Sequence, residues 1–294
     1  MTHWQAIAEH ISQSLNKPFQ IQQTNSVGGG SINSAYKVSG INGQSYFVKF
    51  NSASLEHMFQ VEFDSLNELS NAPEMQTSAM QIPSPICFGT TGSKSYLVLE
   101  YLTMSSRGDG AAMGHALSQM HRITAAQYGW YQNNIIGSTP QSNQQHSDWL
   151  SFWREERMIP QLKMLYDKGY KQRLLPLSDR LLNKLDSLLG SHNPPASLLH
   201  GDLWSGNYAY DKKGQPVIFD PALYYGDRES DLAMTELFGG FGQDFYRAYN
   251  EAWPLDEAYN TRKTLYNLYH ILNHANLFGT SYLNQAISMM DRLC

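Results

Sequence analysis

The sequence is poor in cysteine, with only Cys87 and Cys294 in 294 residues, and only 16% of its residues are charged. Two cysteines are too few for a disulfide framework, which favours a reducing compartment. The formal net charge is −5, so we expect no broad surface for nucleic acid or for an anionic membrane. No apolar run reaches the roughly 18 residues that span a bilayer. The first residues contain Glu9 and lack a basic start followed by an apolar core, so they predict an amphipathic helix and no signal peptide. We therefore expect a cytoplasmic globular protein.

Residues 19–50 have the pattern of three antiparallel strands. Apolar and polar residues alternate on both sides of Asn42-Gly43, which is a strong hairpin signal. A helical spacing of apolar residues follows over 53–69, and ICFG and SYLVLEYL then predict two more strands. The first hundred residues therefore read as three strands, a helix and two strands.

The rest of the chain changes character. Helical periodicity dominates it, over residues 110–124, 146–166, 176–190, 229–238 and 256–278. Strands are expected only at SLLH and in a hairpin that turns at Lys213-Gly214. The sequence thus predicts an α+β fold with a small β-rich lobe over 1–103 and a larger, mainly helical lobe over 104–294. The aromatic residues of the 148–161 helix are expected in the core of the second lobe: Trp149, Phe152 and Trp153.

Lys49 lies in the third predicted strand, in the segment YFVKF. Val48 and Phe50 flank it, so they would face the opposite side of the strand from its ammonium group. Its expected partner is Glu62, which stands among apolar residues of the next helix, where an unpaired carboxylate would be costly. A lysine on a strand with a carboxylate on the following helix is the arrangement by which kinases anchor nucleotide phosphates.

The glycines between the first two strands could let backbone amides approach a polyphosphate. They match the kinase pattern G-x-G-x-x-G only in part, because Asn33 holds the last glycine position. A plain hairpin loop is an equally good interpretation of this segment alone. The expected nucleotide contacts here are Gly28, Gly29, Gly30 and Ser31.

The segment LLHGDLWSGNYAY places an acid and an amide five residues apart on one loop. His200, Asp202 and Asn207 reproduce the spacing H-x-D-x-x-x-x-N of the kinase catalytic loop, with Gly201 where that pattern has arginine. Asp202 would accept the proton of an attacking hydroxyl, and Asn207 would bind a metal ion. Asp220, which closes the strand PVIFD, is the second expected metal ligand.

Two further elements complete the kinase pattern. His200 is expected to support the loop by hydrogen bonding, and Asp231 to hold the backbone of that loop from the following helix. Glu100, Tyr101 and Leu102 end the last strand of the small lobe, where kinases bind adenine through backbone groups.

The segments LLHGDLWSGN, VIFDPALYYGDRESDLAM and FVKFN…MFQVEFDSL together resemble the fructosamine kinase (ketosamine-3-kinase) family. That family belongs to the aminoglycoside-phosphotransferase-like branch of the protein-kinase fold, and the resemblance covers nearly the whole chain. It implies Asp202 as the base, Asn207 and Asp220 as the ligands of Mg²⁺, and Lys49 with Glu62 as the anchor for ATP. The chain departs from the family in its glycine loop.

The resemblance also implies the acceptor. Members of the family use ATP to phosphorylate the 3-hydroxyl of ketosamines such as ribulosamines and fructosamines, on small amines or on proteins, which leads to deglycation. Trp204 could cover the apolar face of the sugar or pack in the core of the large lobe, and the sequence leaves both open.

Two other functions stay open on the sequence alone. The chain could phosphorylate another small alcohol or an aminoglycoside, although its last 54 residues (241–294) hold few of the acids that a polycationic acceptor needs. It could also be a non-catalytic nucleotide-binding pseudokinase, although such proteins usually lack one of the polar groups found here. A protein kinase is disfavoured because the segment after Asp220 is too short for an activation loop. The oligomeric state is left open.

Overall fold

The chain divides into two compact units in the computed structural model, which describes residues 2–28, 32–76 and 78–294. Unit 1 comprises Met1–Asp109 and Ala209–Asp220, and unit 2 comprises Gly110–Tyr208 and Pro221–Cys294. The lobe boundary after residue 103 stays a prediction. No sequence pattern had indicated that residues 209–220 group with the first part of the chain.

Unit 1 is built on one antiparallel sheet of five strands, in the order β1-β2-β3-β5-β4. The predicted run of three strands, a helix and two strands is therefore correct. Gly43 takes a φ of 81° in the turn between β2 and β3, which explains why glycine follows Asn42 there. The strands span Ile21–Val27 (β1), Ser34–Gly40 (β2), Ser45–Ser52 (β3), Pro85–Thr91 (β4) and Lys94–Glu100 (β5).

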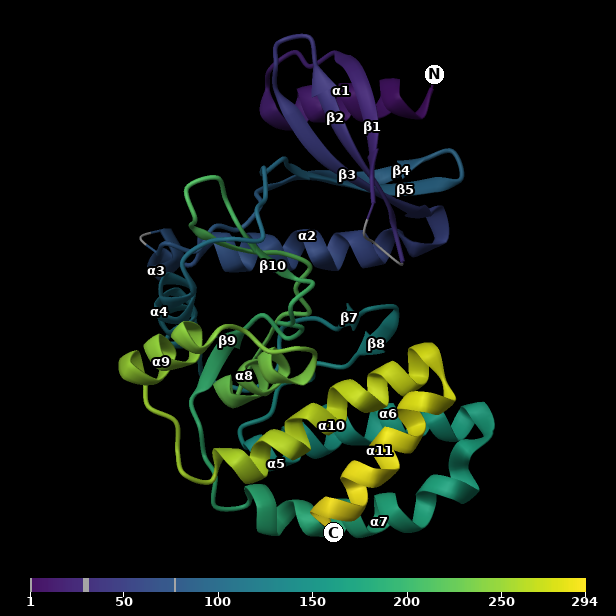
Figure 1. The fold of residues 1–294 in the computed structure, drawn as a ribbon. Helices are drawn as coiled ribbons and strands as arrows, with labels where there is room; N and C mark the ends of the chain where they lie inside the picture. Colours follow the sequence, from purple (N-terminus) through teal and green to yellow (C-terminus); the bar gives the residue numbers. More distant parts are fainter. Residues whose placement is uncertain (1, 29–31, 77) are drawn as a thin grey trace. The chain divides into compact units, whose positions relative to one another are not determined.

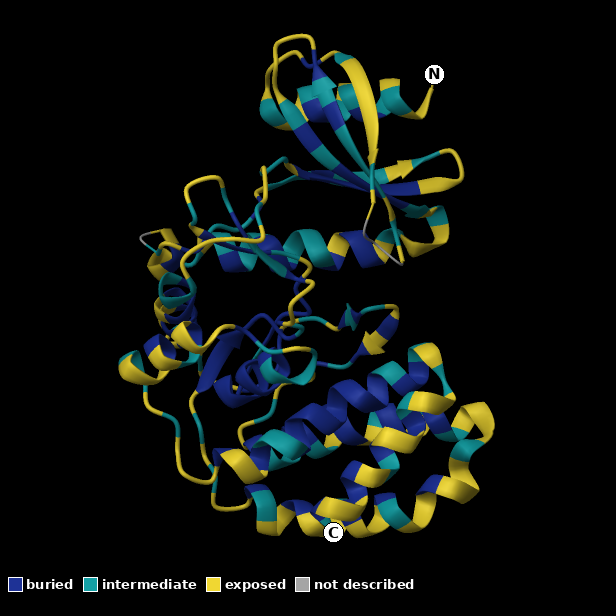
Figure 2. Ribbon diagram, in the orientation of Figure 1, coloured by how far each residue is buried: buried dark blue, intermediate teal, exposed yellow. Residues whose placement is uncertain are grey.

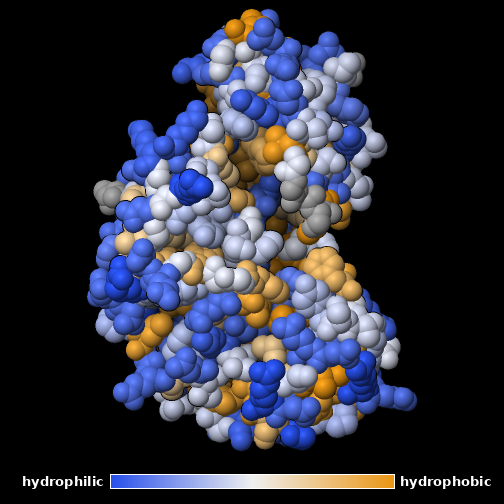
Figure 3. Space-filling view, in the orientation of Figure 1, coloured by the Kyte–Doolittle hydropathy of each residue, from blue (hydrophilic) through white to orange (hydrophobic). Residues whose placement is uncertain are grey.

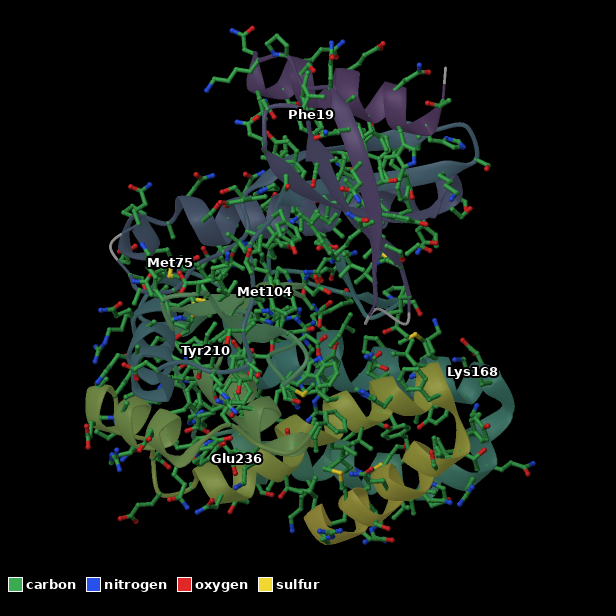
Figure 4. The ribbon with its side chains drawn as sticks, turned by 45° about the horizontal axis from the view of Figure 1, so that its top comes forward. Phe19, Met75, Met104, Lys168, Tyr210 and Glu236 are labelled. Carbon is green, nitrogen blue, oxygen red and sulfur yellow. The ribbon has the colours of Figure 1, made fainter. Side chains whose placement is uncertain are left out.

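Helices α1 (His3–Leu15) and α2 (Glu56–Asn71) lie on opposite faces of this sheet (Figure 1). Val48 and Phe50 of β3 are buried in a cluster with Ile7 and Ile11 of α1. Phe19, labelled in Figure 4, joins the same cluster. Because side chains alternate along a strand, the side chain of Lys49 leaves β3 on the other face, as predicted. A short helix, α3 (Pro73–Gln76), follows α2.

A β-hairpin from later in the chain belongs to unit 1. Its strands are β10 (Tyr208–Tyr210), which begins at the unit boundary, and β11 (Pro216–Ile218). Backbone hydrogen bonds tie the hairpin to the first segment: Ser105 and Tyr210 exchange two, and the amide of Gln81 donates to Pro216. This hairpin ends at Asp220, so the chain brings that aspartate into the unit that holds Lys49.

Unit 2 is mainly helical, as predicted. Helix α10 is buried along most of its length (Figure 2). The helices are α4 (Gly110–His121), α5 (Trp149–Phe152), α6 (Ile159–Leu165), α7 (Lys171–Leu189), α8 (Arg228–Leu237), α9 (Gln243–Ala252), α10 (Tyr259–Phe278) and α11 (Thr280–Leu293). A π-helical segment, Trp153–Met158, extends α5, and the stretch Tyr166–Tyr170 between α6 and α7 is kinked at Gly169, whose φ is 91°. Helices α9 and α11 were not among the predicted segments.

Short strands in unit 2 frame the predicted catalytic loop. β9 (Ala196–Leu199) pairs with β12 (Tyr224–Gly226) and with β6 (Thr124–Ala125), all antiparallel. A separate ribbon joins β7 (Asn134–Ile136) to β8 (Thr139–Gln141). Strands β6, β7, β8 and β12 have only two or three residues each, too few for periodicity to indicate them.

The core of unit 2 is rich in aromatic rings. Trp149, Phe152 and Trp153 are buried, which confirms their predicted place in the core. Apolar side chains also reach the surface among hydrophilic ones on the face drawn in Figure 3. Among the described residues, no helix is both long enough and apolar enough to cross a membrane.

Candidate active site

Three segments of unit 1 bring one lysine and two carboxylates together. The ammonium group of Lys49 on β3 donates to Glu62 Oε1 on α2 at 2.6 Å. It also donates to Asp220 Oδ1, at the end of the β10–β11 hairpin. Glu62 is thus the helix carboxylate that pairs with Lys49, as the sequence predicted. The contact between Lys49 and Asp220, 171 positions apart, was not foreseen.

The charges of this cluster are set by burial and by one another. Burial alone would lower the pKa of Lys49, but the charges of Asp220 and Glu62 outweigh it and raise that pKa, so the ammonium stays charged. Burial raises the pKa of Glu62, and the nearby charge of Asp220 adds to the shift while Lys49 opposes it. Two carboxylates therefore share one ammonium group, and Asp220 is the more exposed of the two.

Asp220 differs from its two partners in exposure. The side chain of Asp220 is 46% exposed, against 7% for Lys49 and 12% for Glu62. Its φ of 57° places it in the left-handed region, which aspartate tolerates better than most residues. An exposed carboxylate next to a buried ion pair is suited to binding a ligand from solvent.

The other predicted nucleotide contacts of unit 1 are only partly described. Gly28 follows β1, while Gly29, Gly30 and Ser31 lie outside the described residues. Glu100 ends β5, and its backbone amide donates to Ser84 O at 2.8 Å. The two residues that follow it, Tyr101 and Leu102, are half-buried. The ammonium group of Lys37 lies 4.3 Å from the centre of the Tyr101 ring.

The predicted catalytic loop follows β9 in unit 2. Asn207 is buried, and its Nδ2 donates to the backbone oxygen of Asp202 at 2.9 Å and to Asp202 Oδ2 at 3.1 Å. His200 is fully buried, and its Nδ1 accepts from the amide of Asp202 at 3.2 Å. The loop thus brings Asp202 and Asn207 into direct contact, and His200 makes the supporting contact that the sequence suggested.

Gly201 explains why this loop has no arginine at that position. Its φ is 79°, and a Cβ added there would lie 2.0 Å from the carbonyl oxygen of Ala222. The same Ala222 donates its amide to His200 O at 2.9 Å. The loop and the Asp-Pro-Ala segment approach too closely for any side chain at residue 201.

Asp231 holds the backbone of the loop from helix α8. Its carboxylate accepts from the amides of His200 at 2.7 Å and Gly201 at 2.8 Å. Burial would raise the pKa of Asp231, but the hydrogen bonds from His121 and from the backbone amide of Gly201 lower it, and the pKa lies below its usual value. These are the contacts that the sequence interpretation required of Asp231.

A buried chain of hydrogen bonds continues behind Asp231, through residues that the sequence did not single out. His121 Nε2 lies 3.2 Å from Asp231 Oδ2, and His121 Nδ1 lies 2.8 Å from the hydroxyl of Tyr249. Arg228 donates to the same hydroxyl at 3.1 Å. Burial lowers the pKa of His121, and a carboxylate can only accept, so the network assigns a neutral ring with its proton on Nε2.

Each group in this chain of hydrogen bonds donates to the next one, from Arg228 to Asp231. Arg228 donates to Tyr249, Tyr249 to His121, His121 to Asp231, and Asp231 accepts from the loop. No motif marks His121, because it stands in the last turn of an apolar helix and reads as a core residue. Its partner Tyr249 lies 128 positions away, and that separation hides the contact from the sequence.

Trp204, between Asp202 and Asn207 in the loop, is 36% exposed. Its indole lies over Gly206, where a Cβ would come within 2.3 Å of the ring. Of the two alternatives that the sequence left open for Trp204, packing in the core is therefore the wrong one.

The oxygen atoms offered by each unit suit a hard divalent cation. In unit 2, Asn207 uses its amide nitrogen on Asp202, so its side-chain oxygen remains for a metal. In unit 1, Asp220 gives one carboxylate oxygen to Lys49 and has a second. Carboxylate and amide oxygens are ligands that Mg²⁺ accepts. The residues present therefore fit the ion that the sequence implied.

Comparison with protein families gives a match over almost the full chain. The family model described as fructosamine kinase matches residues 3–294. A probable ketoamine kinase of Synechocystis is 45% identical over 294 residues, which cover 98% of this chain and 96% of that protein. A chloroplastic protein-ribulosamine 3-kinase of Arabidopsis thaliana is 40% identical over 280 residues, covering 94% of this chain and 83% of the relative.

Solved structures share the fold. A structure from Haemophilus somnus that is named as a fructosamine-3-kinase superposes with a TM-score of 0.87 at 28% identity, covering 99% of this chain and 97% of that one. An ADP-bound aminoglycoside phosphotransferase gives a TM-score of 0.64 at 16% identity, covering 98% of this chain and 97% of the other. The second likeness concerns the fold alone, and it agrees with the predicted kinase-like architecture.

Proposed function

This chain belongs to the fructosamine kinase family, as its motifs predicted, and we propose that it phosphorylates the 3-hydroxyl of ketosamines with ATP. Membership also confirms the prediction of an ATP-dependent phosphotransferase. The observation that carries the proposal is the contact of Lys49 with both Glu62 and Asp220. A lysine paired with a helix carboxylate, next to an aspartate that can hold a metal ion, is the set of groups with which kinases position phosphates.

The two units have different tasks in this proposal. In unit 1, Lys49 binds phosphate oxygens, Glu62 orients Lys49, and Asp220 holds a magnesium ion. The loop from Gly28 to Ser31 covers the phosphates, and Glu100, Tyr101 and Leu102 meet the adenine through backbone groups. Bound ATP and Mg²⁺ supply the phosphoryl group and neutralise its charge.

In unit 2, Asp202 takes the proton of the acceptor hydroxyl at its carboxylate, which general-base catalysis requires. Asn207 orients Asp202 through its amide nitrogen and offers its oxygen to the metal. His200 and Asp231 keep the loop in place through its backbone amides. The exposed indole of Trp204 covers the apolar face of the sugar.

The acceptor class follows from the family and from chemistry. Curated relatives include protein-ribulosamine 3-kinases, so we propose ribulosamines as the better acceptors and fructosamines as weaker ones, on small amines or on proteins. A site that hydrogen-bonds the reacting hydroxyl rejects a sugar that lacks it, because buried polar groups would be left unpaired. Once C3 carries phosphate, loss of a proton from C1 gives an enaminol that expels the phosphate, and the nitrogen is then held as an imine at C1. Water hydrolyses this imine and frees the amine. The reaction therefore leads to deglycation.

The test is phosphate transfer under one condition to ribulose-lysine, fructose-lysine, an aminoglycoside and choline, with NMR location of the new phosphate. We expect transfer to the two ketosamines, at C3, and none with Asp220→Ala. A clear preference for choline or the aminoglycoside, or phosphate on another carbon, would contradict the proposal.

A further inference from the structure

An exposed row of rings in unit 2 begins at the catalytic loop. Trp204 meets Phe238 edge to face, with ring centres 6.2 Å apart. Phe238 lies 4.8 Å from the ring of His274, which also contacts Phe278 at 5.6 Å and Tyr282 at 5.0 Å. We call these five residues the aromatic row. It runs from the loop, past the end of α8, to the junction of α10 and α11 (Figure 1).

The aromatic row is open to solvent at both ends. Phe278 is 58% exposed and Trp204 is 36% exposed, whereas the rings between them are half-buried. Large exposed aromatic rings that touch one another are costly in water and mark a binding surface more often than isolated ones. The row therefore presents apolar surface at its two ends, joined by rings that other described residues cover in part.

The row is fixed to the loop that carries Asp202. The hydroxyl of Ser205 donates to the backbone oxygen of Phe238 at 3.3 Å. A hydrogen bond also orients the ring at the centre of the row, since His274 Nδ1 lies 2.8 Å from His270 O, which can only accept. Burial lowers the pKa of His274, so its ring is neutral and adds no positive charge to the face.

We propose that the aromatic row binds the substituent on the ketosamine nitrogen, so that the acceptor is the ketosamine of an alkylamine chain such as a lysine side chain in a peptide. The inference rests on the proposed function. The nitrogen of a ketosamine is three bonds from C3, so a sugar held between Asp202 and Trp204 places it close to the start of the row. A protonated amine is attracted to aromatic faces, and the alkyl chain beyond it gains from apolar contact.

The aromatic row adjoins the proposed site of phosphoryl transfer, and this position indicates which molecule it binds. The row begins two residues after the proposed base, and its exposed end at Phe278 lies three ring contacts away from Trp204. Contacts at Phe278 can therefore be made only by an acceptor that extends well beyond its sugar. This distinguishes a peptide-borne ketosamine from the same sugar on a small amine.

The experiment compares two acceptors with the same sugar: a ribulosamine of methylamine, and a short peptide with a ribulosyl group on its lysine. For Phe278→Ala we expect kcat/KM to fall about tenfold more for the peptide than for the methylamine derivative, mainly through KM. Phe278→Leu keeps an apolar side chain without the ring, and should give a smaller selective loss. Tyr131→Ala is the matched control, since Tyr131 is 65% exposed and its ring contacts Trp130, outside the row.

The outcomes separate this inference from the function on which it rests. Wild-type turnover of both acceptors, with equal losses or no loss in Phe278→Ala, would overturn the aromatic row as a binding surface and leave the kinase assignment intact. Wild-type protein that phosphorylates neither acceptor would overturn the proposed function, and this inference with it. A selective loss for the peptide that Tyr131→Ala does not reproduce would support both.

Discussion

Two aspartates close together in the sequence, Asp220 in unit 1 and Asp231 in unit 2, have opposite environments. The side chain of Asp220 is 46% exposed, while that of Asp231 is 2% exposed. Asp220 contacts a lysine side chain, whereas Asp231 uses its carboxylate on two backbone amides and a neutral histidine. The carboxylate of Asp220 retains an oxygen for a ligand, whereas the carboxylate of Asp231 is engaged by hydrogen bonds within the protein. The exposure of the side chain and the type of its partners therefore distinguish an aspartate that can bind a ligand (Asp220) from one that supports the loop (Asp231).

The same contrast extends to the surroundings of each aspartate. The cluster around Asp220 gathers charges, whose interaction changes when a ligand binds. The chain behind Asp231 runs from Arg228 through the neutral groups of Tyr249 and His121, so opposite charges lie at its two ends. Such a fully satisfied buried network stabilises one conformation of the loop. Unit 1 thus holds charged groups that can rearrange around a ligand, whereas unit 2 holds a hydrogen-bonded network that keeps the loop in one conformation.

The largest effect is expected from a methyl group in the loop of unit 2. Gly201 and Gly43 have φ values of 79° and 81°, but a Cβ would meet Ala222 O at 2.0 Å at the first position and nothing within 4 Å at the second. Gly43→Ala should cost about 1–2 kcal/mol for its left-handed backbone. Gly201→Ala should cost clearly more and also lower kcat, as urea denaturation and turnover would measure. Equal losses in the two variants would show that the close approach is not essential.

The next effect concerns the supporting acid itself. Asp231→Asn weakens the acceptor of two backbone amides and of His121 in a buried site, so unfolding should become easier by about 1–3 kcal/mol. Asp244→Asn removes a carboxylate from an exposed ion pair with Arg247, which solvent screens, and should change stability little. Thermal unfolding of both variants is the measurement. A loss as small as that of the control would mean that Asp231 does not hold the loop.

In unit 1, the test is a double-mutant cycle on kcat/KM. Lys49→Met and Glu62→Gln should each lower kcat/KM. Expressed as free energies, the loss in the double variant should be smaller than the sum of the two single losses by about 0.5–3 kcal/mol. The reason is that the contact at 2.6 Å is lost in full with the first substitution. Strictly additive losses would mean that Glu62 acts independently of Lys49.

The smallest effect is a pH dependence of stability in unit 2. Burial lowers the pKa of His270 to about 3; His274 and Arg157 add to the shift, and Asp231 opposes it. Below pH 6.5, His270 is protonated in the unfolded chain but stays neutral in the folded chain. The free energy of unfolding therefore falls as pH decreases toward about 3.

His270→Gln should flatten this slope by about 1.4 kcal/mol per pH unit between pH 6 and 4. Urea denaturation across that range is the measurement. An unchanged slope would show that His270 takes up its proton in the folded state.

Local patterns in the sequence predicted much of both units. Alternation around Asn42-Gly43 predicted the strands of the small sheet, and the apolar surroundings of Glu62 identified the partner of Lys49. The spacing from His200 to Asn207 predicted a loop whose members are in contact. These predictions succeeded because each rests on neighbours within a few residues, or on a carboxylate that needs a partner.

Contacts between distant segments could not be predicted in this way. The pairing of His121 with Tyr249 and the return of residues 209–220 to unit 1 depend on how whole elements pack. The sequence pattern did not predict helix α11, because its apolar positions are mixed with Gln and Ser. Gly201 looked like a departure from the kinase pattern, and only the position of Ala222 O shows why glycine is needed.

The most direct test of the division between the two units is to measure ATP binding and phosphoryl transfer together, in the presence of Mg²⁺, for Asp202→Asn and Asp220→Ala. Asp202→Asn should bind ATP as the wild type does and transfer phosphate on the order of 10²–10⁴-fold more slowly, because only the base is lost. Asp220→Ala should weaken ATP binding and abolish transfer. Undiminished transfer in either variant, or equal loss of ATP binding in both, would contradict the account.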